Sequence, residues 1–329
     1  MNDLSLSPLK NPSVDSLHHS GDGGSEKDEL TGSSNSCGLD NSPRRRYRSY
    51  SNESLSKISN NSFTASALLM TLRGEHYYRG VPDKQDYIAA FACFKHGSNQ
   101  TGDGRAAAWS NFYLGEMFYL GRGVSRDNDI AHAFWKLAVK QHYDPVVSAK
   151  AAAWVGQLYY KVGMATSEPS VKNKLLQAAF SSFRYVINNP YDEDALAIAN
   201  LRIGMLYEDG EGTACDYASS QDHYKKAAQQ KAHYAVSLTA TLCLCDMAYA
   251  AKDYRLALQY CTPVAEQQLD QAHAAKAKLR RGVLYLENRY GIKRDVRRAY
   301  LDLHDVAHQM DDLDAAAKAI LELEELHRT

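Results

Sequence analysis

The chain has 329 residues, of which 44% are hydrophobic, and a net charge of -1 at pH 7. A chain of this length can bury a sizeable core, and its near-neutral charge argues against a general attraction to nucleic acid or to an anionic membrane surface. The best apolar run, residues 235–245, is about half as long as a membrane-spanning helix needs to be, so we expect no membrane span.

Residues 1–62 are rich in Ser, Asn, Gly and Asp, and they contain no Phe, Tyr or Trp before Tyr47. Such a composition cannot bury enough apolar surface to offset the entropy lost on ordering, so we expect a disordered tail. The beginning of this tail lacks the apolar core of a secretory signal. A polar leader rich in Ser and Asn is also typical of effectors that bacterial pathogens deliver into host cells, and this alternative stays open.

A basic segment in this tail, residues 44–48, contains four arginines beside serines. Arg46 and Arg48 precede Ser51 at a spacing that a basophilic kinase reads. Our hypothesis is that Ser49 or Ser51 is phosphorylated, and that the added negative charge changes how the tail binds. The alternative is a basic run that is merely solvated.

Residues 106–138 predict a helix, a glycine turn and a second helix. Apolar residues recur at helical spacing over residues 106–120 and again over 131–138, and Asp127 or Asp129 can cap the second helix. Gly115 lies inside the first helix, where glycine costs roughly 1 kcal/mol relative to alanine. We therefore expect a neighbouring helix to approach this glycine closely.

The same unit recurs along the chain. The helical glycine appears as Gly74, Gly115, Gly156 and Gly204, then Cys245 stands in its place, then Gly282 follows, at spacings of 41, 41, 48, 41 and 37 residues. Periods of this size are typical of a solenoid, in which each unit buries its apolar face against the next. The extra residues of the third copy are expected in loops around residues 168–170 and 188–191.

At these residues the sequence resembles the Sel-one-like (Sel1-like) repeat family, which is related to the tetratricopeptide repeat. The best match is the second copy, with Leu114, Gly115, Tyr119, Gly121, Gly123, Val124, Asp127, Ala131 and Trp135. The fourth copy matches nearly as well, the first, third and sixth are partial, and the fifth looks more like an ordinary tetratricopeptide unit. The resemblance covers about residues 66–310, and it is specific for the fold and nearly silent on chemistry.

The expected fold is all-α, a right-handed α-solenoid of about six helix-turn-helix repeats over residues 63–310. Residues 311–329 follow as a helix with one apolar and one acidic face, which we interpret as a cap that shields the last repeat from water. The alternative is that its apolar stripe binds a partner or a second copy of the protein.

The cysteines indicate a reducing compartment. They lie at unrelated places in the repeats and not as one pair per repeat, the arrangement of the disulfide-rich secreted members of the family; they are Cys37, Cys93, Cys215, Cys243, Cys245 and Cys261. We expect them to be reduced and the protein to be cytoplasmic. Cys243 and Cys245 are too close in sequence for a zinc pair and are expected to pack in a core.

The densest positive charge lies in the sixth copy, over residues 276–298. The candidate partner-binding residues are Arg280, Arg281, Lys293, Arg294, Arg297 and Arg298. This patch suits an acidic peptide, a phosphorylated segment or a phosphoinositide head group. The alternative is a set of exposed salt bridges from Arg280, Arg294 and Arg297 to Asp295, Asp302 and Asp305. No nucleic acid is expected, because the other repeats lack matching basic runs.

His304 and His308 have a metal-ligand spacing, but no third ligand is evident. We also find no serine, histidine and acid arrangement and no nucleotide-binding loop, so we expect no catalytic site, cofactor or metal. The resemblance implies a non-catalytic protein-protein interaction scaffold or adaptor. The many tyrosines suit a groove that binds peptides or helices. The alternatives are the secreted bacterial effector and, less favoured, a hydrolase.

Overall fold

The computed structural model describes residues 62–80, 84–99, 103–140, 143–230, 233–286, 292–308 and 313–328. Residues 1–61 of the predicted disordered tail, with Ser49, Ser51 and the basic segment, lie outside the described residues, and Ser62 begins a helix. Among the described helices, none is both long enough and apolar enough to cross a membrane.

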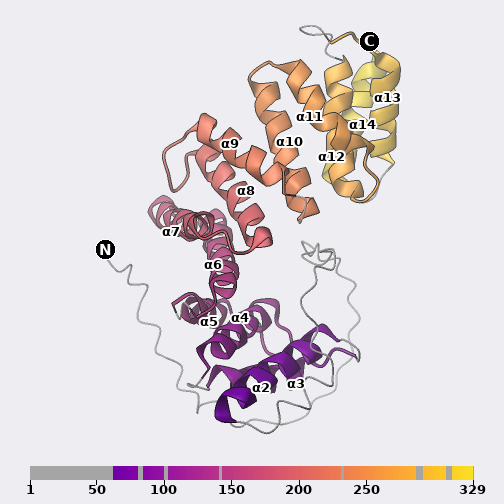
Figure 1. Cartoon of the computed structure of the whole chain (residues 1–329). Coiled ribbons are helices and arrows are strands. Elements are labelled where there is room, and N and C mark those ends of the chain that lie inside the picture. The colour runs from indigo at the N-terminus through magenta and orange to yellow at the C-terminus, as the bar shows by residue number, and fades with distance from the viewer. Residues whose placement is uncertain are drawn as a thin grey trace. The chain divides into compact units, whose positions relative to one another are not determined.

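The described residues form thirteen α-helices and no β-strand (Figure 1). In chain order they are α2 (Ser62–Arg79), α3 (Tyr87–Ser98), α4 (Gly104–Leu120), α5 (Asn128–Lys140), α6 (Pro145–Ala165), α7 (Pro169–Asn188), α8 (Glu193–Asp209), α9 (Tyr217–Ala228), α10 (Tyr234–Ala250), α11 (Tyr254–Glu266), α12 (Gln271–Leu286), α13 (Val296–Ala307) and α14 (Leu313–Arg328).

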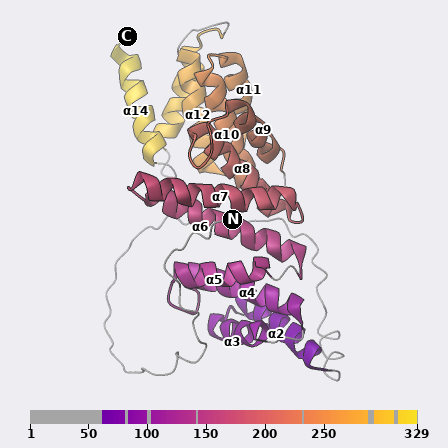
Figure 2. The same ribbon diagram turned by 90° about the vertical axis from the view of Figure 1, so that its left-hand side faces the viewer.

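These helices pack in consecutive pairs, from α2 with α3 to α12 with α13 (Figure 2). The first helix of each pair also contacts the first helix of the next pair, and α14 packs on both α12 and α13. All the substantial contacts join helices that are adjacent or next but one in the chain. This nearest-neighbour pattern defines an α-solenoid, so the predicted all-α fold class is confirmed.

Aspartates begin many of these helices. Asp103, for example, accepts hydrogen bonds from the backbone N–H groups of Arg105 and Ala106 at 3.1 and 3.0 Å, which satisfies donors that the first turn leaves without a helical partner. For α5, the sequence left Asp127 and Asp129 open as caps. Asp127 performs this role, because its Oδ1 accepts from the backbone N–H groups of Asp129 and Ile130, both at 2.9 Å.

The helical glycines allow the close approach that the sequence predicts. A Cβ atom at Gly204 would lie 2.6 Å from the ring of Tyr224 on the second helix of the pair, and one at Gly156 would lie 2.7 Å from the ring of Phe183. Gly115 faces Trp135 in the same way. Each glycine therefore makes room for a large, buried side chain of the facing helix.

The fifth pair reaches the same packing by a different choice of residues. Cys245 takes the place of the glycine, and Cys261 of the second helix packs in the same core cluster. Both cysteines are buried. Two side chains of intermediate size thus replace one glycine and one ring. The turn is shorter here, and Lys252 adopts the left-handed conformation that glycines supply in other turns (φ 62°).

In the third pair, α6 and α7, the structure differs from one expectation of the sequence analysis. The extra residues were expected in loops around residues 168–170 and 188–191, but they lengthen the helices instead. Helix α6 has 21 residues and α7 has 20, against 17 and 13 in α4 and α5. The physical reason is that this copy lacks the Gly-x-Gly turn, so α6 continues past the point where α4 ends at Gly121 (φ 70°).

Candidate functional site

The connection between α12 and α13 holds part of the predicted basic patch in a fixed position. Ile292 is buried in the core of the last repeats. The backbone N–H of Asp295 donates to the carbonyl of Tyr285 at 3.1 Å, and Asp295 Oδ1 accepts from the backbone N–H of Arg298 at 3.0 Å, which caps α13. Lys293 and Arg294 lie between these anchored residues, and both are exposed.

Arg280 and Arg281, two of the predicted partner-binding residues, form ion pairs within the protein. Arg281 donates from Nε and Nη2 to both carboxylate oxygens of Asp302 on α13, each at 2.8 Å, and its Nη1 lies 3.1 Å from Glu266 Oε1. The hydrogen bonds to Asp302 raise the pKa of the Arg281 guanidinium. Arg280 binds Asp246 on α10 through two hydrogen bonds.

These pairs differ from the salt bridges considered from the sequence. Asp302 binds Arg281, and Asp305 binds Lys278. Asp295 lies 3.6 Å from Arg298 Nε. The physical reason is that consecutive residues of a helix are rotated by about 100° around its axis. Arg280 and Arg281 therefore lie on different faces of α12, the first toward α10 and the second toward α13. Arg280 and Arg281 thus link α12 to its neighbours.

Most of the remaining cations gather around a cavity of about 650 Å³, which we call the basic pocket. Its lining comes from the start of α11, the end of α12 and the start of α13, and comprises Arg255, Leu258, Tyr285, Ile292, Lys293, Arg294, Asp295 and Arg298. Arg297 is exposed but does not line this cavity. Arg255 is a residue that sequence reasoning missed, because it belongs to the preceding repeat, outside the dense run of charge.

Arg298 is held in place over the pocket. Its Nη1 donates to the Tyr285 hydroxyl at 3.2 Å, and its guanidinium carbon lies 5.8 Å from the centre of the Tyr285 ring. The hydrogen bond that Arg298 donates to the Tyr285 hydroxyl and, to a smaller extent, the charge of Asp295 raise the pKa of Arg298. Arg255, Lys293 and Arg294 form no ion pair with another side chain in the part of the chain that the structure describes. They are available to an external anion.

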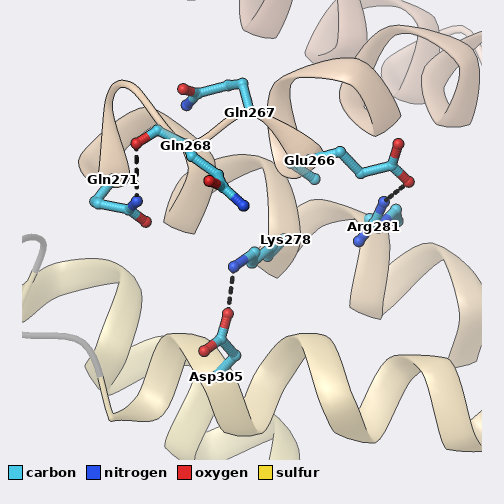
Figure 3. Close-up of a pocket in the computed structure, with 8 residues that line it drawn as sticks. Glu266, Gln267, Gln268, Gln271, Lys278, Arg281 and Asp305 are labelled. Atoms are coloured by element: carbon cyan, nitrogen blue, oxygen red, sulfur yellow. Dashed lines mark hydrogen bonds and ion pairs between the residues drawn. The ribbon is translucent and has the colours of Figure 1, made fainter.

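A second recess, of about 570 Å³, lies on α11, α12 and α13 and is shown in Figure 3. Its charges neutralise one another, because Lys278 pairs with Asp305 and Arg281 with Glu266. The rest of its polar lining consists of amides, among which Gln271 Nε2 donates to the carbonyl of Gln268 at 3.1 Å. This recess therefore has little net charge to attract an anion, unlike the basic pocket.

His304 of α13 and His308, which follows the end of this helix, are stacked at the surface. The rings of His304 and His308 lie 4.2 Å apart between centres, and His308 Nδ1 is hydrogen-bonded to the carbonyl of His304 at 2.7 Å. The described residues contain no group of three or more His, Cys, Asp and Glu side chains arranged around a common metal-ion position. The cysteines among them have free thiols.

Comparison of this chain with known proteins found likeness in structure only. No family model matches the sequence, and no curated protein matches it. A protective antigen present in uropathogenic Escherichia coli strains, which displays an SLR fold, is 19% identical with a TM-score of 0.59; the match covers 80% of this chain and 49% of the antigen. A Sel1 repeat protein from Oxalobacter formigenes is 18% identical with a TM-score of 0.55; the match covers 79% of this chain and 92% of that protein.

These matches show that the described residues adopt the Sel1-like repeat fold, as the resemblance in sequence implies. The chain spans about half the length of the Escherichia coli antigen. At these identities the likeness concerns the fold, and it assigns no role to the basic pocket.

Proposed function

We propose that this protein is a non-catalytic scaffold or adaptor in the cytoplasm, which binds partner proteins through its stacked repeats and holds an acidic segment of one partner in the basic pocket. The observation that carries the proposal is the division among the cations of the last repeats. Arg280 and Arg281 are used in internal ion pairs, whereas Arg255, Lys293 and Arg294 face a cavity with no internal ion pair.

The fold supports the same function. Solenoids present side chains of several repeats on continuous surfaces, which suit binding better than catalysis. The basic pocket adds a directional contact, because guanidinium groups form strong, charge-assisted hydrogen bonds with carboxylates and phosphates. A partner with an acidic segment would place that segment across α11, α12 and α13.

Affinity capture from the native host tests the proposal. The full chain is compared with a variant that carries Arg255→Glu, Lys293→Glu and Arg294→Glu. A control with Lys140→Glu, Lys174→Glu and Arg184→Glu makes the same change in net charge at exposed positions of α5 and α7. We expect a partner that the wild type and the control retain and that the pocket variant loses.

The captured partner must then bind again when both proteins are purified, which excludes an indirect contact. Retention of every partner by the pocket variant would contradict the role of the basic pocket and would move the binding surface to other repeats. Equal losses in the pocket variant and the control would mean that overall charge, and not this site, governs capture.

A further inference from the structure

The basic pocket carries an excess of positive charge that a single carboxylate does not balance. Its lining contains four cationic side chains and one carboxylate, that of Asp295. Asp295 is already engaged, because it caps α13 and lies 3.6 Å from Arg298. A carboxylate brings one negative charge, whereas a phosphomonoester brings about 1.5 to 2 at pH 7, with three acceptor oxygens. The latter complements the excess of three positive charges more closely.

The shape of the basic pocket favours a side chain over a free anion. The cavity of about 650 Å³ is much larger than a phosphate group, and Leu258, Tyr285 and Ile292 provide apolar surface beside the cations. Ile292 is only 7% exposed, whereas Leu258 and Tyr285 are half-buried, so this apolar surface lies within an open depression. A ligand that fills such a cavity needs an apolar or aromatic stem as well as an anionic end.

We propose that the basic pocket recognises a phosphorylated side chain on a partner protein. This inference rests on the proposed function and names the chemistry that the same site binds. Arg255, Lys293 and Arg294 contact the phosphoryl oxygens, Arg298 is held ready by Tyr285, and the apolar surface packs against the stem of the phosphorylated residue. A protein source is favoured over a phosphoinositide because the apolar residues of the lining are buried or half-buried and do not form an exposed apolar face that could enter a bilayer.

Fluorescence anisotropy with degenerate peptide pools tests the inference. Three labelled pools share random flanking residues and differ at the central position, which is phosphoserine, phosphotyrosine or glutamate. Samples of the two phosphorylated pools are also treated with phosphatase. We expect the full chain to bind at least one phosphorylated pool about tenfold or more tightly than the same pool after phosphatase treatment and than the glutamate pool.

Matched variants locate the binding. The triple variant of Arg255, Lys293 and Arg294 should lose this preference, while the control of Lys140, Lys174 and Arg184 keeps it. Tyr285→Phe, which removes only the hydroxyl that orients Arg298, should weaken phosphopeptide binding about threefold. Circular dichroism and the thermal midpoint check that each variant is folded.

The pH dependence of peptide affinity distinguishes a bound phosphate group from a bound carboxylate. The second pKa of a phosphomonoester is about 6, and no histidine lines the basic pocket, so the ligand itself titrates between pH 7.5 and 5.5. Binding of the phosphorylated pool should weaken several-fold over this interval, whereas a glutamate keeps its charge.

Three results would overturn the inference. The glutamate pool could bind as tightly as the phosphorylated pools, or no pool could bind. Vesicles that contain a phosphoinositide could bind through the pocket while the peptides do not. The capture experiment distinguishes failure of this inference from failure of the proposed function. If the pocket variant loses a native partner, and phosphatase treatment of that partner does not weaken its binding to the wild type, the proposed function stands. Only recognition of a phosphoryl group is then rejected.

Discussion

At the scale of single residues, the helical glycines allow the close packing of the helix pairs that contain them. Gly115 faces Trp135, whose ring would overlap a Cβ atom at that position. Trp135 is fully buried, its Nε1 donates to the carbonyl of Phe112 at 3.2 Å, and its ring stacks on Trp154 of α6. The ring therefore has little freedom to move away.

The substitution Gly115→Ala tests whether the contact with Trp135 or the helix propensity of residue 115 has the larger effect on stability. If Gly115 were merely a helical residue, alanine would stabilise the protein by about 1 kcal/mol through its higher helix propensity. Because of the contact with Trp135, we expect a net destabilisation of about 2 kcal/mol. Urea unfolding of the variant and the wild type measures the difference, and a gain in stability would contradict the account.

His132 on α5 is a buried polar residue that the sequence did not single out. Its Nε2 has no hydrogen-bond partner in the described structure, and its ring packs against Tyr159 of α6 at 5.0 Å between centres. Burial, with a smaller contribution from Lys136, lowers its pKa to about 4. The sequence gives no signal for this, because the burial of His132 depends on a residue of the next repeat.

The lowered pKa of His132 predicts loss of stability in mild acid. The unfolded chain binds a proton near pH 6.5 and the folded protein only near pH 4, so the unfolded state is favoured as pH falls between these values. At pH 5 this residue alone should cost about 2 kcal/mol relative to pH 7.5. His132→Leu should remove that part of the pH dependence in urea unfolding, and an unchanged dependence would contradict the assignment.

At the scale of elements, the contact between α12 and α13 depends on the pair formed by Arg281 and Asp302. The two side chains are 13% and 11% exposed. Asp302→Ala should destabilise the protein by about 3 kcal/mol, because it leaves the Arg281 guanidinium buried without that partner. Arg298→Gln removes a pair whose side chains are 67% and 41% exposed, and it should cost less than about 1 kcal/mol. Thermal unfolding of both variants measures this contrast, and equal losses would contradict it.

The helices and their contacts differ in how well the sequence alone predicts them. Spacing alone predicted the helices, the capping role of Asp127 or Asp129 and the close approach at the glycines, because these depend on residues within one unit. The ion pairs of α12 were not predictable in this way. Arg280 pairs with Asp246 of the preceding repeat, and Arg255 joins the basic pocket from α11. Such pairings depend on the register between repeats, which the period in the sequence does not specify.

At the scale of the whole described fold, each pair of helices packs within itself and against the adjacent pairs. Stability in such an array is local, approximately a sum of units and nearest-neighbour contacts. We therefore expect Gly115→Ala to accelerate amide hydrogen exchange in α4, α5 and α6 and to leave exchange in α11, α12 and α13 close to the wild type. Mass spectrometry of exchanged peptides measures this, and uniform acceleration along the array would contradict a solenoid with local stability.

Partner binding at the basic pocket of the last repeats depends, in this proposal, on the three cations Arg255, Lys293 and Arg294. The most direct measurement is the dissociation constant between the purified partner and the full chain, compared between wild type, the triple variant of Arg255, Lys293 and Arg294, and the control of Lys140, Lys174 and Arg184. We predict a loss of at least about tenfold for the pocket variant and no loss for the control, with affinity that falls as salt rises. Equal dissociation constants for all three proteins would show that the partner does not bind at the basic pocket.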